Sequence, residues 1–348
     1  MEKWNKIALN EKSTVNNAIS ILEKNKSSIV LVIDENDLLL GVITDGDIRS
    51  GLLKGINLNQ SIKFIYNNKP YVANIKDGIN KIKSDLKYRN INQVPVVNDE
   101  GKVVRIVSIK KKKKCIHSKN SVVLMAGGEG TRLKPLTEKC PKPLLKIGDK
   151  PVLEIIILKL IKFGFKEFFI SVNYKSEMIE QHFGDGSKWD INIEYLREKK
   201  KLGTAGSLTL LPKIDSAPLL LMNADLLTNI NFKHLIDYHL KNNSLATMCV
   251  RKYEFQIPFG VVNTIENILF SIEEKPKKNF FVNAGIYVIQ PELIKYIPSS
   301  TFYDMPDLFN VLLDQKKKVT VYPIGEYWID IGSKNDFEQA NSEYHEFY

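Results

Sequence analysis

A short apolar run that leads straight into a glycine-rich loop restricts the possible folds of this chain more than any other feature. Ser121–Ala126 is apolar and has the length of a buried strand. Three glycines and two cations follow it, at Gly127, Gly128, Gly130, Arg132 and Lys142. Glycines at such a place let the backbone approach a ligand closely and direct its N–H groups toward phosphates. The pattern predicts an α/β fold with an anionic ligand where the strand ends.

This loop fits neither of two common phosphate-binding motifs. No Gly-Lys-Ser/Thr follows it, so it is not a P-loop. The segment Gly128–Gly130 also lacks the third glycine of a dinucleotide fingerprint. A nicotinamide-dependent dehydrogenase is therefore disfavoured.

Strand and helix patterns alternate through the rest of residues 120–348. These patterns occupy residues 151–163, 168–172, 176–183, 218–222 and 232–240. Alternation of this kind predicts a Rossmann-like, doubly wound, mostly parallel sheet. In such sheets the ligand lies at the carboxyl ends of the strands, which is where the glycine loop begins.

Residues 1–109 contain an internal repeat. Val30–Asp34 aligns with Val94–Asn98, and the same offset of 64 residues places Thr44 on Ser108. A helix-period segment precedes each copy. The repeat resembles a tandem pair of cystathionine-β-synthase (CBS) domains, which implies an α+β module that binds an adenosine nucleotide or another effector of the pathway.

The CBS resemblance implies one possible ligand site. In that family a Thr/Ser-x-x-Asp motif contacts a ribose, and Thr44 and Asp47 match it. The second copy has Ser108 but carries Lys111 at the aspartate position, so at most one copy keeps the ribose pattern. A purely architectural role, as a platform for a homo-oligomer, stays open beside ligand binding.

Charge and composition limit the partners. The net charge is +10, and much of the excess lies in Lys110–Lys114. No aromatic residue interleaves with this run, so we interpret it as a solvated linker and expect no nucleic-acid partner. It separates a CBS pair at 1–116 (about 1–57 and 58–116) from a catalytic domain at 117–348.

Neither a membrane anchor nor a metal cluster is indicated. No apolar run approaches the roughly 20 residues of a membrane span, and the N-terminus lacks the apolar core of a signal peptide. The three cysteines show no CxxC spacing, which argues against a zinc site. We expect a cytoplasmic protein with no membrane partner.

The run Leu124–Pro143 resembles the signature of the sugar-1-phosphate nucleotidyltransferases, whose fold is GT-A-like. The resemblance implies that Arg132 and Lys142 are catalytic and neutralise the reacting phosphates. It also implies a set of nucleotide-binding residues, which are Ala126, Gly127, Gly128, Gly130, Thr131, Gly203 and Thr204. Glu198, just upstream of the second loop, is expected to accept from a purine N–H edge or to be a solvated charge.

Further motifs of the family follow in the expected order. The resemblance implies Mg²⁺ on Asp225 and Asp330, since two carboxylates plus substrate phosphates suit this ion. Ala224 stands where the family usually has glycine. Contacts with the sugar phosphate are implied for Glu274, Lys275 and Asn283.

The resemblance implies transfer of a nucleotidyl group from an NTP to a sugar 1-phosphate. A CBS pair before this domain resembles a small group of bacterial guanylyltransferases that includes one of legionaminic acid biosynthesis. That implies GTP and glucosamine 1-phosphate. Mannose or heptose 1-phosphate with GTP, and glucose 1-phosphate with UTP or dTTP, remain alternatives, as does a non-catalytic nucleotide sensor.

Overall fold

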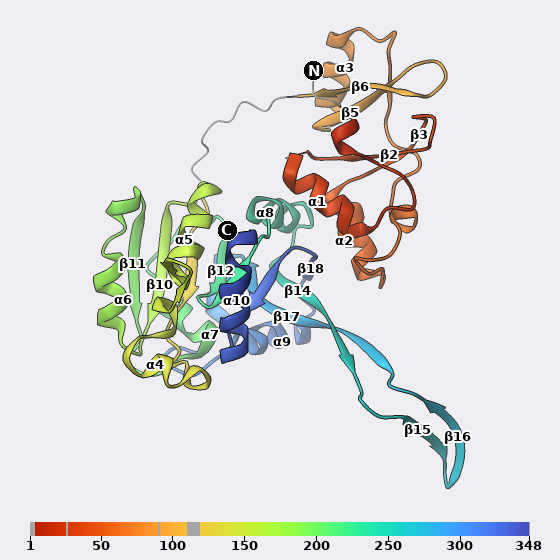
Figure 1. Cartoon of the computed structure of the whole chain (residues 1–348). Helices are drawn as coiled ribbons and strands as arrows, with labels where there is room; N and C mark the ends of the chain where they lie inside the picture. The colour runs from red at the N-terminus through yellow and green to blue at the C-terminus, as the bar shows by residue number, and fades with distance from the viewer. Residues whose placement is uncertain (1–3, 26, 90, 110–118, 348) are drawn as a thin grey trace. The chain divides into compact units, whose positions relative to one another are not determined.

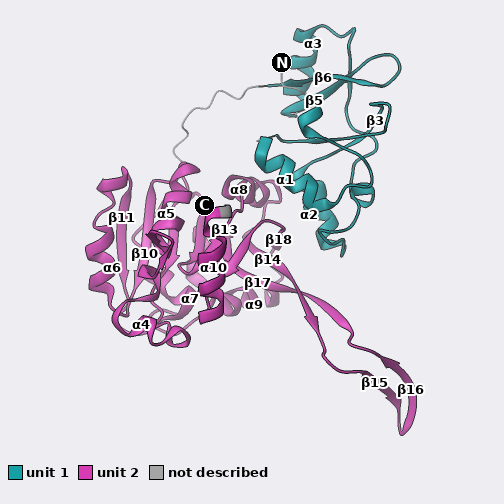
Figure 2. Ribbon diagram, in the orientation of Figure 1, with its two compact units in different colours: residues 1–114 teal, residues 115–348 magenta. Residues whose placement is uncertain are grey.

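The computed structural model describes residues 4–25, 27–89, 91–109 and 119–347. The chain forms two compact units, Met1–Lys114 and Cys115–Tyr348 (Figure 2). The boundary predicted at residue 116 and the lysine run, Lys111 included, lie outside the described residues. The exact domain limits therefore stay a prediction.

The sequence repeat in the first unit corresponds to a structural repeat. In each copy a short strand runs parallel to a second strand, which pairs antiparallel with a third. The strands are β1 (Ala8–Leu9), β2 (Val30–Ile33) and β3 (Leu39–Ile43), and then β4 (Ala73–Asn74), β5 (Gln93–Val97) and β6 (Val103–Ser108). The helices are α1 (Val15–Asn25), α2 (Asp45–Leu53) and α3 (Ile79–Tyr88).

Backbone hydrogen bonds join the two copies at their turns. Leu39 N donates to Gly101 O at 3.1 Å, and Val103 N donates to Asp37 O at 3.0 Å. Val103 also packs in one apolar cluster with Leu31 of the first copy. The two copies therefore form one folded module.

A seven-stranded sheet organises the second unit, in the order β11-β10-β7-β12-β17-β14-β18. Its strands are β7 (Val122–Met125), β10 (Glu167–Val172), β11 (Asn192–Arg197), β12 (Leu219–Asn223), β14 (Ala246–Gln256), β17 (Lys277–Ile289) and β18 (Val319–Ile324). Only β17 among these runs against the others. The predicted mostly parallel sheet is confirmed.

Helices cover both faces of this sheet, as doubly wound folds require (Figure 1). Along β7, Val122 and Leu124 pack into one apolar cluster while Val123 packs into the other. The helices are α4 (Leu136–Lys139), α5 (Val152–Lys162), α6 (Ser176–Phe183), α7 (Gly203–Gly206), α8 (Phe232–Lys241), α9 (Met305–Asp314) and α10 (Lys334–Phe347). The remaining short strands are β8 (Lys146–Ile147), β9 (Lys150–Pro151), β13 (Leu226–Thr228) and β19 (Trp328–Asp330).

A long antiparallel ribbon projects from the sheet (Figure 1). β14 and β17 continue past the other strands and lead into β15 (Val261–Ile265) and β16 (Ile268–Glu273). We call residues 252–282 the arm. The sequence patterns did not indicate it.

The described helices include none that is both long and apolar enough to cross a bilayer.

Candidate active site

The glycine loop begins where β7, a central strand, ends. Gly130 has φ +63°, and a Cβ there would lie 2.9 Å from Thr137 Cγ2 and 3.1 Å from Lys142 Cβ. The Thr137 hydroxyl donates to Gly130 O at 2.8 Å. Glycine is therefore required at this position, because the loop folds back tightly enough to place Lys142 against it.

Two aspartates meet at the same edge of the sheet. Asp225 follows β12, the neighbour of β7, and Asp330 ends β19. The antiparallel pairing of β13 with β19 places Leu226 opposite Asp330, and Ile331 N donates to Asp225 O at 3.0 Å. The two carboxylates, which are about 100 residues apart in sequence, are thereby brought together.

The two predicted catalytic cations lie at these carboxylates. Lys142 Nζ forms an ion pair with Asp225 Oδ2. The guanidinium of Arg132 lies beside Gly332, since its Nη1 would be 3.6 Å from a Cβ placed there. Four predicted site residues from separate segments therefore gather in one place.

The electrostatics of the pair favour a bound cation. Burial, together with the neighbouring Asp225, raises the pKa of Asp330 to about 6, and Lys142 and Arg132 oppose that rise. Asp225 Oδ1 and Asp330 Oδ1 are buried, and neither accepts a hydrogen bond from the residues that the structure describes. Buried oxygens without partners cost free energy unless a ligand satisfies them. Two such carboxylates fit Mg²⁺, which prefers oxygen ligands and keeps several waters.

The second predicted loop packs against the start of α9. Gly203 has φ +79°, and a Cβ there would lie 2.6 Å from Tyr303 O. Thr204 donates from its backbone N and its hydroxyl to Asp304 Oδ1, at 2.8 and 3.0 Å. The hydroxyl also accepts from Met305 N at 2.9 Å. The Thr204 side chain thus fixes the loop to the helix.

Asp304 is a positioning residue that the sequence motifs did not indicate. It forms a capping box with Asp307 at the N-terminus of α9, besides accepting from Thr204. The Asp-x-x-Asp spacing before an apolar helix is visible in the sequence and indicates such a cap. Its contact with a loop 100 residues away is not visible there, because local patterns carry no such information.

Glu198 links both loops to the sheet. Its Oε1 accepts from the hydroxyl of Ser171 on β10, and its Oε2 accepts from Leu202 N at 2.8 Å. A Cβ at Gly127 would lie 2.8 Å from Glu198 Oε1. The carboxylate is therefore neither a free surface charge nor without partners, and its contact with a purine stays a prediction.

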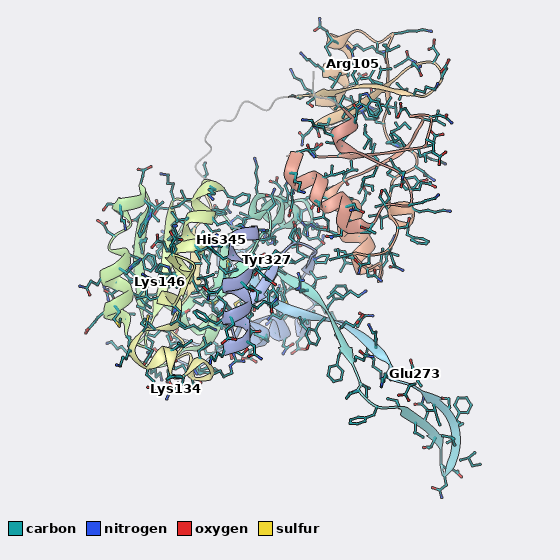
Figure 3. The ribbon with its side chains drawn as sticks, viewed as in Figure 1. Arg105, Lys134, Lys146, Glu273, Tyr327 and His345 are labelled. Atoms are coloured by element: carbon teal, nitrogen blue, oxygen red, sulfur yellow. The ribbon has the colours of Figure 1, made fainter. Side chains whose placement is uncertain are left out.

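The residues predicted to contact the sugar do not lie together in the structure. Asn283 lies close to the carboxylate site: its Oδ1 accepts from Gly285 N at 3.0 Å, and a Cβ at Gly285 would lie 2.7 Å from Asn223 Nδ2. Glu274 and Lys275 are exposed on the arm, next to Glu273, which Figure 3 shows well away from the sheet. The structure does not bring these two to the site of their own chain.

The predicted CBS ligand residues bond to each other. Thr44 and Asp47 form a capping box at the start of α2. Thr44 N and its hydroxyl donate to Asp47 Oδ2 at 2.8 and 2.6 Å, and Asp47 N donates to the hydroxyl at 3.3 Å. This pair stabilises a helix terminus, whatever else it binds.

The fold and the site together are typical of α/β proteins that bind phosphorylated ligands where their strands end. The chain belongs to the nucleotidyl transferase family, whose model matches residues 121–346. A CBS-domain model matches residues 3–54, the first of the two repeats. The resemblances seen in the sequence are therefore confirmed for the family and for the CBS domain.

Curated relatives are similar over a little more than three fifths of the chain. A mannose-1-phosphate guanyltransferase of Pichia angusta is 31% identical over 224 residues, covering 62% of this chain and 61% of that protein. A UTP–glucose-1-phosphate uridylyltransferase of Synechocystis is 31% identical over 238 residues, covering 63% and 61%. The chain thus spans about 61% of the length of these relatives.

Solved structures share the fold. The crystal structure of HddC from Yersinia pseudotuberculosis complexed with GMP-PN has a TM-score of 0.52 and 23% identity. The match covers 65% of this chain and 99% of that one. At this identity the likeness shows the fold of the second unit alone.

Proposed function

We propose that this protein is a sugar-1-phosphate nucleotidyltransferase. An oxygen of the sugar 1-phosphate attacks the α-phosphorus of an NTP, a P–O bond forms there, and the bond to pyrophosphate breaks. Such a displacement needs no covalent enzyme intermediate, so the protein contributes positioning and charge neutralisation. The observation that carries the proposal is the meeting of Lys142, Arg132, Asp225 and Asp330 beside the glycine loop.

The residues of the site have distinct proposed roles. The loop from Ala126 to Thr131 holds the nucleotide with its backbone N–H groups. Arg132 and Lys142 neutralise charge on the triphosphate and on the leaving pyrophosphate. The sugar phosphate lies against Asn283, whose side chain is exposed beside the site.

Asp225 and Asp330 would hold a magnesium ion. Their buried oxygens without protein partners support this assignment. The ion, when bound, would supply Lewis-acid stabilisation of phosphate charge. The two carboxylates would hold the ion near the end of β12. Lys142 is held at the same place by its ion pair with Asp225.

For the substrates we propose GTP and glucosamine 1-phosphate. Relatives named as mannose-1-phosphate guanyltransferases support guanine, and the N-terminal CBS domain supports the legionaminic acid group of enzymes. The uridylyltransferase among the relatives keeps UTP with glucose 1-phosphate as an alternative. A cytoplasmic location accords with these substrates and remains a prediction.

For the CBS pair we propose an adenosine nucleotide or a pathway effector at Thr44 and Asp47. The capping box engages Oδ2 of Asp47, and a carboxylate accepts at both of its oxygens, so a ribose hydroxyl can donate to Asp47 Oδ1 while the box stays formed. Calorimetry of the full chain with AMP, ATP and GTP would detect this site as the heat of binding that Asp47→Ala removes.

The decisive experiment is a matrix of four NTPs against several sugar 1-phosphates, read by pyrophosphate release. The proposal expects release with Mg²⁺ and at least one pair, and the highest kcat/KM for GTP with glucosamine 1-phosphate. Release with another pair would correct the substrate only. Tight nucleotide binding without release from any pair would contradict the enzyme and favour a sensor.

A further inference from the structure

The arm, residues 252–282, carries large apolar side chains that the described part of the chain leaves in solvent. Six aromatic residues are each 43–73% exposed: Tyr253, Phe255, Phe259, Phe270, Phe280 and Phe281. Aliphatic side chains on β15 and β16 add to them. Soluble monomers seldom expose so many large apolar groups together, and such patches mark interaction sites.

The arm is also incompletely paired along its backbone. β18 pairs with β14 only as far as Arg251, and β12 pairs with β17 only over Ile286–Ile289. Beyond these points the arm is a two-stranded ribbon, and no other strand among the described residues pairs with its edges (Figure 1). Isolated ribbons are marginally stable in water, and open edges are templates for pairing.

The apolar residues are arranged as faces rather than scattered. The register places Tyr253 opposite Phe280, and alternation puts Phe255 on the same face. Further out, Val262 lies opposite Ile272. Each segment of the ribbon therefore offers apolar side chains on a common face that a partner can cover.

The exposed apolar area is large for a two-stranded ribbon. An aromatic side chain carries about 150–250 Å², so six that are half exposed present on the order of 600 Å² over the two faces of the ribbon. A standard interface buries about 800 Å² on each partner. One face of the arm supplies part of that area, and the aliphatic side chains of β15 and β16 add to it.

The charges of the arm are divided between its two parts. The base carries three lysines and one glutamate, which are Lys252, Lys277, Lys278 and Glu254. The outer part carries three glutamates and one lysine, which are Glu266, Glu273, Glu274 and Lys275. A second arm lying antiparallel would place its acidic outer part against the basic base. A membrane surface would select a clustered basic segment instead.

We propose that the arm is a homodimerisation element, in which the arms of two copies pack side by side and antiparallel about a twofold axis. A twofold contact requires a surface that complements itself, and the arm has one in both its apolar faces and its charges. β14 points the same way as β12, so the arm leaves the sheet at the edge where Asp225 lies. The outer part of the partner's arm would then lie near the rim of the active site.

Cross-linking between two isotopic forms of the full chain tests this directly. A carbodiimide joins lysine amines to carboxylates in contact, and mass spectrometry of mixed ¹⁴N and ¹⁵N protein separates links between chains from links within one. The proposal expects links between chains from Lys277 or Lys278 to Glu266 or Glu273. Links found only within chains would overturn it.

Charge reversal makes the test specific to the antiparallel arrangement. The first variant carries Glu266→Lys with Glu273→Lys, and the second carries Lys277→Glu with Lys278→Glu. Each alone places like charges together and should lose most of the arm-to-arm links. Mixing the two variants should restore the links, because the opposite charges then meet again. Failure of the mixture to restore them would contradict the arrangement.

A variant that replaces an apolar residue of the arm distinguishes loss of the contact from loss of the groups that cross-link. Phe270→Asp leaves every lysine and glutamate in place and should still abolish the links between chains. Leu313→Asp, on an exposed site of α9 with 57% exposure, should leave them unchanged. Unchanged links in Phe270→Asp would overturn the proposal, as would wild-type arms that associate with neutral or anionic vesicles instead of with each other.

Discussion

Two pairs of polar side chains in this molecule differ in how many of their hydrogen bonds the protein itself provides. Thr44 and Asp47 bond to each other and to the first turn of α2. Asp225 and Asp330 each keep a buried oxygen without a described partner, and the pKa of Asp330 is raised to about 6. The first pair is explained by folding alone. The second is unfavourable for the ligand-free protein and is therefore the stronger indication of a ligand.

The largest effect should come from the unsatisfied pair. Asp225→Asn should lower kcat/KM by more than ~10³-fold, since losing an outer-shell partner of a metal already costs ~10–100-fold. The check is pyrophosphate release at saturating Mg²⁺. Asp47→Asn is the matched control and should retain wild-type catalysis. Normal turnover by Asp225→Asn would contradict the view that the Asp225–Asp330 pair binds a ligand needed for catalysis.

Loss of either cation should have the next largest effect. Lys142→Ala and Arg132→Ala should each lower kcat by roughly 10²-fold, as losses of electrostatic stabilisers do. Steady-state kinetics distinguish this loss of kcat from a rise in KM alone. A rise in KM alone would indicate that these residues bind the substrate and the transition state equally. Lys146→Ala, an exposed lysine on β8, should behave as the wild type.

The satisfied pair should affect stability and not catalysis. Thr44→Ala removes an N-cap and should lower the free energy of unfolding of the first unit by about 1 kcal/mol. Urea unfolding monitored in the full chain would measure this. Ser50→Ala, at an exposed position of the same helix, should not destabilise. Equal stability of Thr44→Ala and the wild type would mean that the capping box has no structural importance.

The Asp225–Asp330 pair should also have a smaller effect, on how the free energy of unfolding changes with pH. The pKa of Asp330 lies above its ordinary value of 3.8, so its stabilising contribution is present below about pH 4 and is lost as the pH rises through 6. Without divalent cations, Asp330→Asn should exceed the wild type in stability by about 1 kcal/mol near pH 7.5, allowing for partial exposure. The difference should shrink toward pH 4. A less stable variant at pH 7.5 would contradict this.

Local patterns in the sequence predict much of the fold. The helix expected at 176–183 is α6, and the one at 232–240 is α8 with one further residue. The 64-residue repeat corresponds to two sheets of equal topology. These elements follow from periodicity and from capping residues, which act over a few positions.

The contacts that build the site depend on pairings that local patterns do not contain. Asp225 and Asp330 meet because β13 pairs with β19, and Thr204 is fixed by Asp304. The family resemblance implied that the two aspartates act together, but not that Thr204 and Glu198 are held by intramolecular bonds. The arm was missed because its apolar residues resemble those of a buried sheet in sequence.

Binding of Mn²⁺ in place of Mg²⁺, followed by electron paramagnetic resonance in the presence of GTP, tests the difference between the two pairs most directly. We expect the wild type and Asp47→Asn to immobilise Mn²⁺ equally. We expect Asp330→Asn, at the same GTP concentration, to bind Mn²⁺ at least ~10-fold more weakly. Equal Mn²⁺ affinity in Asp330→Asn and the wild type would contradict the assignment of the buried carboxylates as the metal site.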